Sequence, residues 1–67
     1  MDTAFETLIG EIVALIRDAG YEPYDQLYGY ISTGKEEFIT RKGQAREKVK
    51  ALSLEELKEF VEKMDHN

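Results

Sequence analysis

Apolar residues recur at helical spacing along this chain, and no other feature of the sequence limits the fold as strongly. Near the N-terminus, six of them follow the i, i+3, i+4, i+7 spacing of one helix face: Phe5, Leu8, Ile9, Ile12, Val13 and Ile16. Thr3 and Glu6 form a capping-box pattern, in which each side chain accepts a hydrogen bond from a backbone N–H that the first turn leaves unpaired. Gly20 suits a left-handed cap, so we expect the first helix over about 4–19.

The second helix is bounded by a proline and a glycine. Pro23 fits the first turn of a helix, while Gly34 fits its end. We expect this helix over about 23–33. Gly29 lies inside it, at a cost of about 1 kcal/mol relative to alanine. A glycine at this position favours either a second helix backbone packed closely against it or no special contact, and both interpretations stay open.

Two more helices are expected in the second half of the chain. Thr40 as an N-cap predicts a third helix over about 41–51. Ser53 and Glu56 repeat the capping-box pattern and predict a fourth over about 54–64. The sequence leaves open whether these two are separate helices or one kinked rod.

The expected fold class is therefore all-α: a small bundle of three to four short helices in one domain, residues 1–67. A core of this size rarely supplies more than ~3–5 kcal/mol of stability. Disulfides and thiolate zinc sites are excluded because the chain has no cysteine, and the one histidine, His66, lies next to the C-terminal residue. A partner subunit remains as the means of completing the bundle. We expect a homodimer, with no metal or other cofactor.

Charge and hydropathy argue against two classes of partner. The formal net charge is -5, and an acidic protein repels nucleic acid and anionic membrane surfaces. The longest apolar run, at 12–16, is far shorter than a membrane span. The N-terminus lacks the pattern of a signal peptide. We therefore expect no nucleic-acid partner, no membrane partner and a cytoplasmic location.

The sequence lacks the residues that nucleophilic catalysis requires. A nucleophile needs a base within hydrogen-bond reach, and the base needs an orienting group. With no cysteine and a single histidine near the end of the chain, such a set cannot be built. The carboxylates are expected on the solvated surface, and no glycine motif that cradles phosphate occurs. We expect that the protein is not an enzyme.

Basic residues are concentrated in the segment 41–50. It holds five cations against one carboxylate, Glu47, a local charge of +4 in a chain of net charge -5. The cations are Arg41, Lys42, Arg46, Lys48 and Lys50. Runs of charge usually form salt bridges or stay solvated, so the simpler interpretation is an exposed basic face that pairs with the acidic helices of a neighbour. The alternative is a docking surface for an acidic or phosphorylated partner.

Four tyrosines lie within ten residues, and two of them belong to an apolar stripe. The stripe consists of Tyr24, Leu27, Tyr28 and Ile31. Tyr30 is expected to face elsewhere. Tyrosine combines a large contact area with a polar tip, which favours this stripe as the centre of a protein–protein interface.

The same part of the chain carries a motif of seven residues: Gly20, Tyr21, Pro23, Gln26, Gly29, Tyr30 and Gly34. In type and spacing they resemble the signature of the IreB family of small regulatory phosphoproteins of Gram-positive bacteria. The likeness continues through Phe38-Ile39 to Ala45 and Arg46, and it covers about residues 8–64.

This resemblance implies a helical dimer without catalytic activity, phosphorylated by a membrane Ser/Thr kinase that senses the state of the cell wall. Family members pass that signal to the control of peptidoglycan synthesis. The family's phosphorylated threonines lie on an arm upstream of the first helix, and this chain has almost no arm. Thr3 and Thr7 are the candidates here, but they do not align with the family's sites residue by residue. The family's Asp-Pro after the motif is Lys35-Glu36, so a shortened paralogue that kept the dimer and lost the switch is an alternative.

Physical chemistry gives the two threonines different roles. A phosphate on Thr3 would add about -1.5 to -2 charge at the N-terminus of the first helix, where an anion is favoured. The simpler interpretation is that Thr3 only caps the helix. Thr7 lies inside the helix and needs fraying before a kinase can use it. The leading hypothesis is a non-enzymatic regulatory protein with a Ser/Thr kinase and a downstream protein as partners; the second is a constitutive helical dimer or adaptor without a switch.

Overall fold

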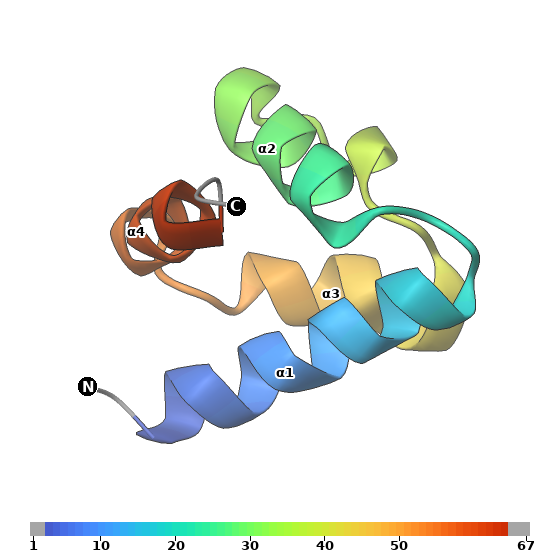
Figure 1. Ribbon diagram of the computed structural model, residues 1–67, viewed down its shortest axis with the longest axis horizontal. Coiled ribbons are helices and arrows are strands. Elements are labelled where there is room, and N and C mark those ends of the chain that lie inside the picture. Colours follow the sequence, from blue (N-terminus) through green and yellow to red (C-terminus); the bar gives the residue numbers. More distant parts are fainter. Residues whose placement is uncertain (1–2, 65–67) are drawn as a thin grey trace.

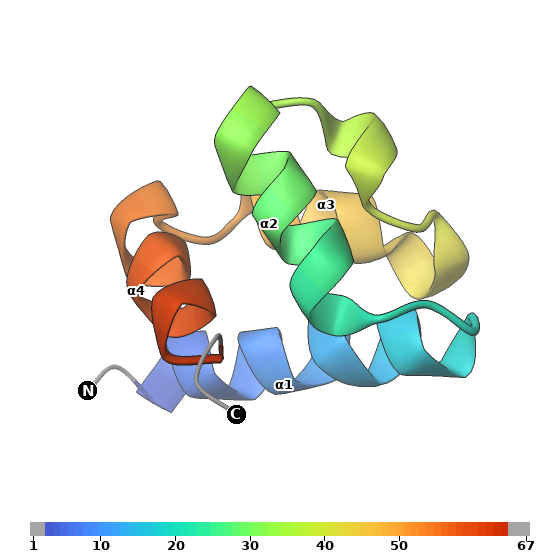
Figure 2. The ribbon, with the colours of Figure 1, turned by 45° about the horizontal axis from the view of Figure 1, so that its top comes forward.

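The computed structural model describes residues 3–64, and every regular element in that range is helical (Figures 1 and 2). The elements are α1 (Thr3–Asp18), α2 (Pro23–Thr33), the 3-10 helices η1 (Glu36–Phe38) and η2 (Lys42–Gln44), α3 (Ala45–Lys50) and α4 (Leu54–Met64). α1 packs along α3, and α2 packs against α4 and η1. α1 also contacts α2, which joins the two pairs into one bundle. This confirms the expected all-α bundle, while His66 lies outside the described residues.

The C-terminus of α1 has the Schellman ending that its sequence predicts. The N–H of Gly20 donates to the carbonyl of Arg17 at 2.9 Å, and the N–H of Tyr21 donates to the carbonyl of Ile16 at 3.1 Å. Gly20 has a φ of 92°, a left-handed conformation that glycine adopts without a steric penalty from a Cβ atom. At its other end, α1 already includes Thr3, which therefore lies in the first turn and not before it as an N-cap.

α2 has the bounds that proline and glycine predict. Pro23 is buried at the first turn, and the N–H of Gly34 closes the helix by donating to the carbonyl of Tyr30 at 2.7 Å. A Cβ atom added to Gly29 would lie 2.5 Å from Cδ1 of Phe38. The close neighbour of Gly29 is therefore an aromatic ring of η1, and not a second helix backbone.

The expectation of a third helix over 41–51 is wrong in its first part. Gly43 and Gln44 have φ values of 57° and 63°, which a right-handed helix does not contain, so α3 begins only at Ala45. A Cβ atom at position 43 would also lie 2.5 Å from Cδ2 of Leu15 in α1. The positive φ favours glycine at position 43, whereas the Leu15 methyl group is the end of a flexible side chain and could move.

The two predicted caps of the second half act differently. The hydroxyl oxygen of Thr40 accepts a hydrogen bond from the N–H of Lys42 at 3.3 Å, which closes a turn and does not cap a helix. The hydroxyl oxygen of Ser53 accepts one from the N–H of Glu56 at 3.4 Å, at the start of α4. The bend between Lys50 and Leu54 separates α3 from α4, so these are two helices and not one rod.

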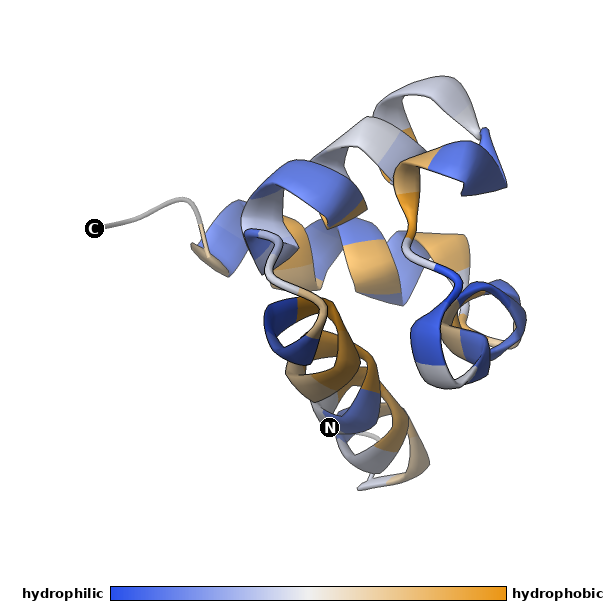
Figure 3. Ribbon diagram, turned by 90° about the vertical axis from the view of Figure 1, so that its right-hand side faces the viewer, coloured by the Kyte–Doolittle hydropathy of each residue, from blue (hydrophilic) through white to orange (hydrophobic). Residues whose placement is uncertain are grey.

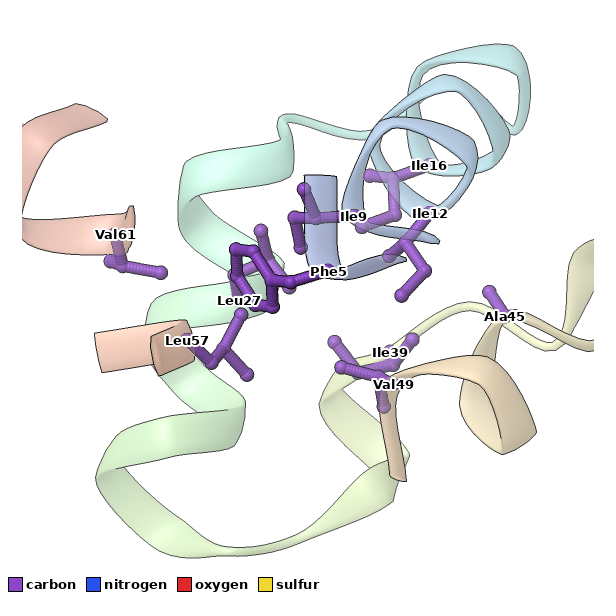
Figure 4. Packing of buried hydrophobic residues seen from close by; sticks show 10 residues of the cluster. All are labelled: Phe5, Ile9, Ile12, Ile16, Leu27, Ile39, Ala45, Val49, Leu57 and Val61. Atoms are coloured by element: carbon purple, nitrogen blue, oxygen red, sulfur yellow. The ribbon is translucent and has the colours of Figure 1, made fainter. Parts of the chain in front are cut away.

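The core is one apolar cluster to which all four α-helices contribute. Its buried members are Phe5, Ile9, Ile12, Ile16, Leu27, Ile39, Ala45, Val49, Leu57 and Val61. Figure 4 shows their side chains turned toward one another from the helices and from the segment that holds Ile39. Along the helices, hydrophobic stretches alternate with hydrophilic ones, as amphipathic helices require (Figure 3). Among the described residues no polar or charged side chain is buried.

Candidate interaction surfaces

A groove of about 460 Å³ opens between α1 and α4. The rings of Phe5 and Phe60 meet in it edge to face, with their centroids 6.2 Å apart. The apolar lining is completed by Ile9 and Val13, and charged residues stand around it: Glu6, Arg17, Glu56, Glu59 and Lys63. An apolar surface with a charged rim is typical of a protein–protein contact. The sequence alone does not reveal this groove, because its two walls are distant in the chain.

The α1 wall of the groove has a regular pattern. Its residues Glu6, Gly10, Val13 and Arg17 are spaced i, i+4, i+7, i+11 and therefore share one edge of the helix, which we call the Gly10 edge. A Cβ atom added to Gly10 would meet nothing within 4 Å, so the space over the middle of this edge is open. Within residues 3–64, neither Glu6 nor Arg17 forms an ion pair. The edge thus offers a small apolar centre between two charges of opposite sign.

The tyrosine-containing stripe of α2 is divided between the core and the surface. Leu27 is fully buried within the single chain, so its expected place at an interface is wrong. Tyr24 and Tyr28 stack with their ring centroids 5.6 Å apart, and Tyr28 is 52% exposed. Ile31 is partly buried against the core. Tyr30, which was expected to face elsewhere, also packs partly against the core.

Two polar residues of the family motif fix the same short stretch of backbone. The side-chain carbonyl of Gln26 accepts a hydrogen bond from the N–H of Thr40 at 2.8 Å. Nε of Arg46 donates to the carbonyl of Ile39 at 2.8 Å. α2 and α3 therefore hold residues 39–40 from two sides, which seats the Ile39 side chain in the core.

Most of the other motif residues also determine the fold. Gly20 and Gly34 end α1 and α2, and Gly29 makes room for an aromatic ring. Pro23 and Ala45 are buried. Tyr21 is the exception, since it is 56% exposed. The motif is thus mainly the signature of a fold.

The basic segment 41–50 does not form one free cationic surface. Three of its lysines pair with acidic residues of α1 and η1, at N–O distances of 3.1, 3.2 and 2.9 Å: Lys42 with Asp18, Lys48 with Glu11 and Lys50 with Glu36. Arg46 donates to a backbone carbonyl, whereas Arg41 is exposed. The three lysines are thus paired within the chain itself.

The pair between Lys50 and Glu36 changes the titration of both groups. The hydrogen bond from the Lys50 ammonium, helped by its charge, holds the pKa of Glu36 below the ordinary value of a glutamate. The same hydrogen bond and charge raise the pKa of Lys50. The pair ties η1 to the end of α3, but both side chains are about half exposed, so solvent screens it.

Both candidate threonines are exposed on α1. Thr3 lies in the first turn and Thr7 in the second. Thr7 precedes Glu11 by four residues, which puts the two side chains next to each other on the helix surface. The structure therefore places Thr7, but not Thr3, one turn from an ion pair with α3.

Within residues 3–64, no group of three or more histidine, cysteine, aspartate or glutamate side chains is placed to hold a metal ion. In the same range, no helix combines the length and the hydropathy that crossing a membrane requires.

Comparison with known proteins gives one family. The family described as IreB regulatory phosphoprotein matches residues 1–64 of the 67-residue chain. The match begins upstream of the motif and includes both Thr3 and Thr7. No solved structure was found to match the chain. Because the family matches nearly the whole length, the chain belongs to the IreB family of regulatory phosphoproteins.

Proposed function

We propose that this protein is a non-enzymatic regulator that acts through protein–protein contacts and is switched by a Ser/Thr kinase that senses the state of the cell wall. Its output is the control of peptidoglycan synthesis, through a downstream protein partner in the cytoplasm. The observation that carries the proposal is the family match over residues 1–64. The exposure of Thr3 and Thr7 in the first two turns of α1 supports it, because helix ends open at the lowest cost.

Intact-mass measurement tests the kinase part of this proposal. The protein is incubated with ATP and a cell-wall-sensing Ser/Thr kinase from a related bacterium, and peptides are then mapped. We expect one added phosphoryl group, about 80 Da, on Thr3 or Thr7. A chain with both threonines changed to alanine should stay unmodified.

Thr33→Ala is the matched control. The hydroxyl of Thr33 donates to the carbonyl of Gly29 in α2, far from the start of α1 in sequence, so its loss should leave the added mass unchanged. A full-length chain that gains no mass beside a fully modified positive control would overturn the kinase part.

A constitutive helical dimer or adaptor without a switch is the second candidate function. It is favoured by one observation, that both candidate threonines lie within α1. Kinases bind their substrates in extended form, so the first turns of α1 must open before either hydroxyl can react. Absence of phosphorylation, together with a stable dimer, would support this alternative.

The proposal includes a homodimer, and we propose that its two copies meet along the Gly10 edge. This edge lines the α1–α4 groove, where the half-buried side chains of Val13 and Phe60 present apolar surface above the buried Phe5 and Ile9. A bundle of 67 residues has a small core, and a partner that covers this groove adds the apolar burial that the single chain lacks.

A two-fold axis over the middle of the Gly10 edge makes the edge complementary to itself. In an antiparallel pair of α1 helices, Glu6 of one copy lies opposite Arg17 of the other, and Gly10 lies opposite Val13. The glycine lets the two backbones approach, and the valine fills the open space over it. Opposite charges then meet at both ends. A second copy provides this pattern without further assumptions, which is why we favour it over an unrelated partner.

Charge exchange tests this seam by sedimentation equilibrium. Glu6→Arg and Arg17→Glu should each weaken the dimer by about tenfold, because each sets like charges against each other at both ends. The double variant should restore the affinity, since opposite charges again meet. Glu62→Arg, an equal change of charge on α4 outside the groove, is the control and should have little effect.

Tyr28→Ala separates this seam from the one that the sequence predicts on α2. A seam along Tyr24, Tyr28 and Ile31 would lose affinity in this variant, whereas a seam along the Gly10 edge would keep it. A double charge-exchange variant that remains monomeric would overturn the two-fold arrangement.

A further inference from the structure

Lys48 of α3 pairs with a residue in the third turn of α1. Its Nζ donates a hydrogen bond to Oε1 of Glu11 at 3.2 Å. Its side chain is 33% exposed, and that of Glu11 is 52% exposed, so the pair sits at the surface and can rearrange without disturbing the core. Among the ion pairs of residues 3–64 that include a residue of α1, this one involves the residue nearest to the start of the helix.

The direction of packing brings Thr7 toward the same lysine. Asp18 pairs with Lys42 and Glu11 with Lys48, so α1 and the η2–α3 segment run in opposite directions. The next turn of α1 before Glu11 carries Thr7, which is exposed. Side chains four residues apart on a helix lie about 5–6 Å from each other at Cβ, within the reach of a lysine side chain.

We propose that Lys48 is the receptor for a phosphate carried by Thr7, and that this phosphate displaces the Glu11 carboxylate from Lys48. The inference rests on the proposed function, in which a kinase modifies this chain. In that reaction the hydroxyl oxygen of Thr7 forms a bond to the γ-phosphorus of ATP, and the bond from this phosphorus to the β–γ bridging oxygen breaks. ADP leaves, and the hydroxyl proton passes to the base of the kinase.

The exchange of partners follows from charge. A phosphate on threonine carries about -1.5 to -2 charge and three acceptor oxygens, against the single charge of Glu11. It stands one turn from Glu11, and the two anions repel each other. Lys48 therefore moves to the more highly charged group, and Glu11 turns to solvent. α1 stays tied to α3, while the surface beside the tie gains net negative charge.

Thr3 cannot use the same receptor. It lies two turns before Glu11, about 12 Å along the helix axis, and is separated from Lys48 by the turn that carries Thr7. The structure thus distinguishes two threonines that the sequence presents as equivalent candidates, and it assigns the contact with α3 to Thr7.

Chemical synthesis of the full chain tests the receptor without a kinase. One product carries phosphothreonine at position 7, the control carries it at position 3, and each is also made with Lys48→Gln. The midpoint of the second phosphate ionisation, followed by phosphorus NMR against pH, reports a nearby cation because a cation favours the dianion. We expect Lys48→Gln to raise the midpoint at position 7 by a few tenths of a pH unit and to leave that at position 3 unchanged.

Two more variants complete the test. Lys48→Arg should keep the low midpoint at position 7, and Glu11→Gln should lower it further by removing the competing anion. Equal midpoints with and without Lys48 at position 7, or equal shifts at both positions, would overturn the proposal. Circular dichroism of each product confirms the fold. Because no kinase is used, failure here and failure of the kinase experiment are separate results.

Discussion

At the scale of single residues, the contact between Gly29 and Phe38 couples α2 to η1. A Cβ atom at position 29 would lie 2.5 Å from Cδ1 and 2.9 Å from Cγ of the ring. Cγ is the root of the ring, so the whole side chain, and not only its tip, would have to move. The chain thus gives up about 1 kcal/mol of helix propensity in α2 for a contact that holds the following turn in place.

This coupling predicts that Gly29→Ala changes the free energy of unfolding in opposite directions in the native chain and in a Phe38→Ala chain. Gly29→Ala should lower the free energy of unfolding of the native chain by about 1 kcal/mol, because the displaced ring loses its packing. In a Phe38→Ala chain the same change should raise it by about 0.5–1 kcal/mol, because only the helix propensity remains. Urea denaturation of the four proteins gives both values. Effects of the same sign in the two backgrounds would contradict the contact.

Glycines also illustrate what sequence can and cannot predict at this scale. The roles of Gly20 and Gly34 are local, because a left-handed cap depends only on the few residues of its own helix end. Gly29 lies close to Phe38 and Gly43 lies close to Leu15, and both neighbours belong to other elements. The sequence around each glycine therefore does not predict the contact. The backbone conformation of a glycine at a helix end was predictable from the sequence, whereas a close contact between a glycine and a distant side chain was not.

At the scale of elements, two neighbouring residues of α2 differ strongly in how far their side chains are buried. Leu27 is fully buried, whereas Tyr28 is half exposed and contacts Tyr24 by stacking. The apolar period of the sequence places both on one stripe, because periodicity does not tell how wide a face the other helices cover. α4 and the rest of the core cover only the part of the α2 stripe that contains Leu27.

The two positions should therefore differ strongly in their effect on stability. Leu27→Ala should cost about 2–5 kcal/mol by leaving a cavity in the core, which is enough to unfold most of this small bundle. Tyr28→Ala should cost about 0.5–1.5 kcal/mol, the value of an aromatic pair. Thermal and urea unfolding followed by circular dichroism measure both. Similar losses at the two positions would show that Tyr28 is buried in the native assembly.

α3 is the element that sequence reasoning misplaced, and the reason is physical. Cap and period signals predicted α2 and α4 at their observed bounds, since α2 begins at a proline and ends at a glycine, and α4 begins after the Ser53 cap. For α3, the sequence predicts the hydroxyl of Thr40 as a helix cap, but in the structure this hydroxyl closes a turn. A glycine inside a predicted helix is a sign that the helix can be interrupted, and Gly43 is such a residue. Its φ of 57° is incompatible with a right-handed helix at that position.

At the scale of the whole molecule, the groove between α1 and α4 depends on how the helices are arranged. Phe5 and Phe60 are far apart in sequence, and only the fold brings their rings to 6.2 Å. Sequence composition predicted the need for a partner, because a chain of this length without cysteine has a small core. The tyrosine-containing stripe predicted that partner on α2, whereas the open apolar surface beside Gly10 lies on α1.

If this groove is closed by a second copy, folding and association are linked. The melting temperature should then rise with protein concentration, because a partner that binds only the folded chain stabilises it by mass action. For a hundredfold increase in concentration, we expect a rise of about 5–10 °C in a chain of this length. Arg17→Glu should shift this dependence to about tenfold higher protein concentration, while adding Glu6→Arg to it should restore the dependence of the native chain. Scanning calorimetry across that concentration range measures the effect, and a native chain that melts at the same temperature at every concentration would mean that it folds as a monomer.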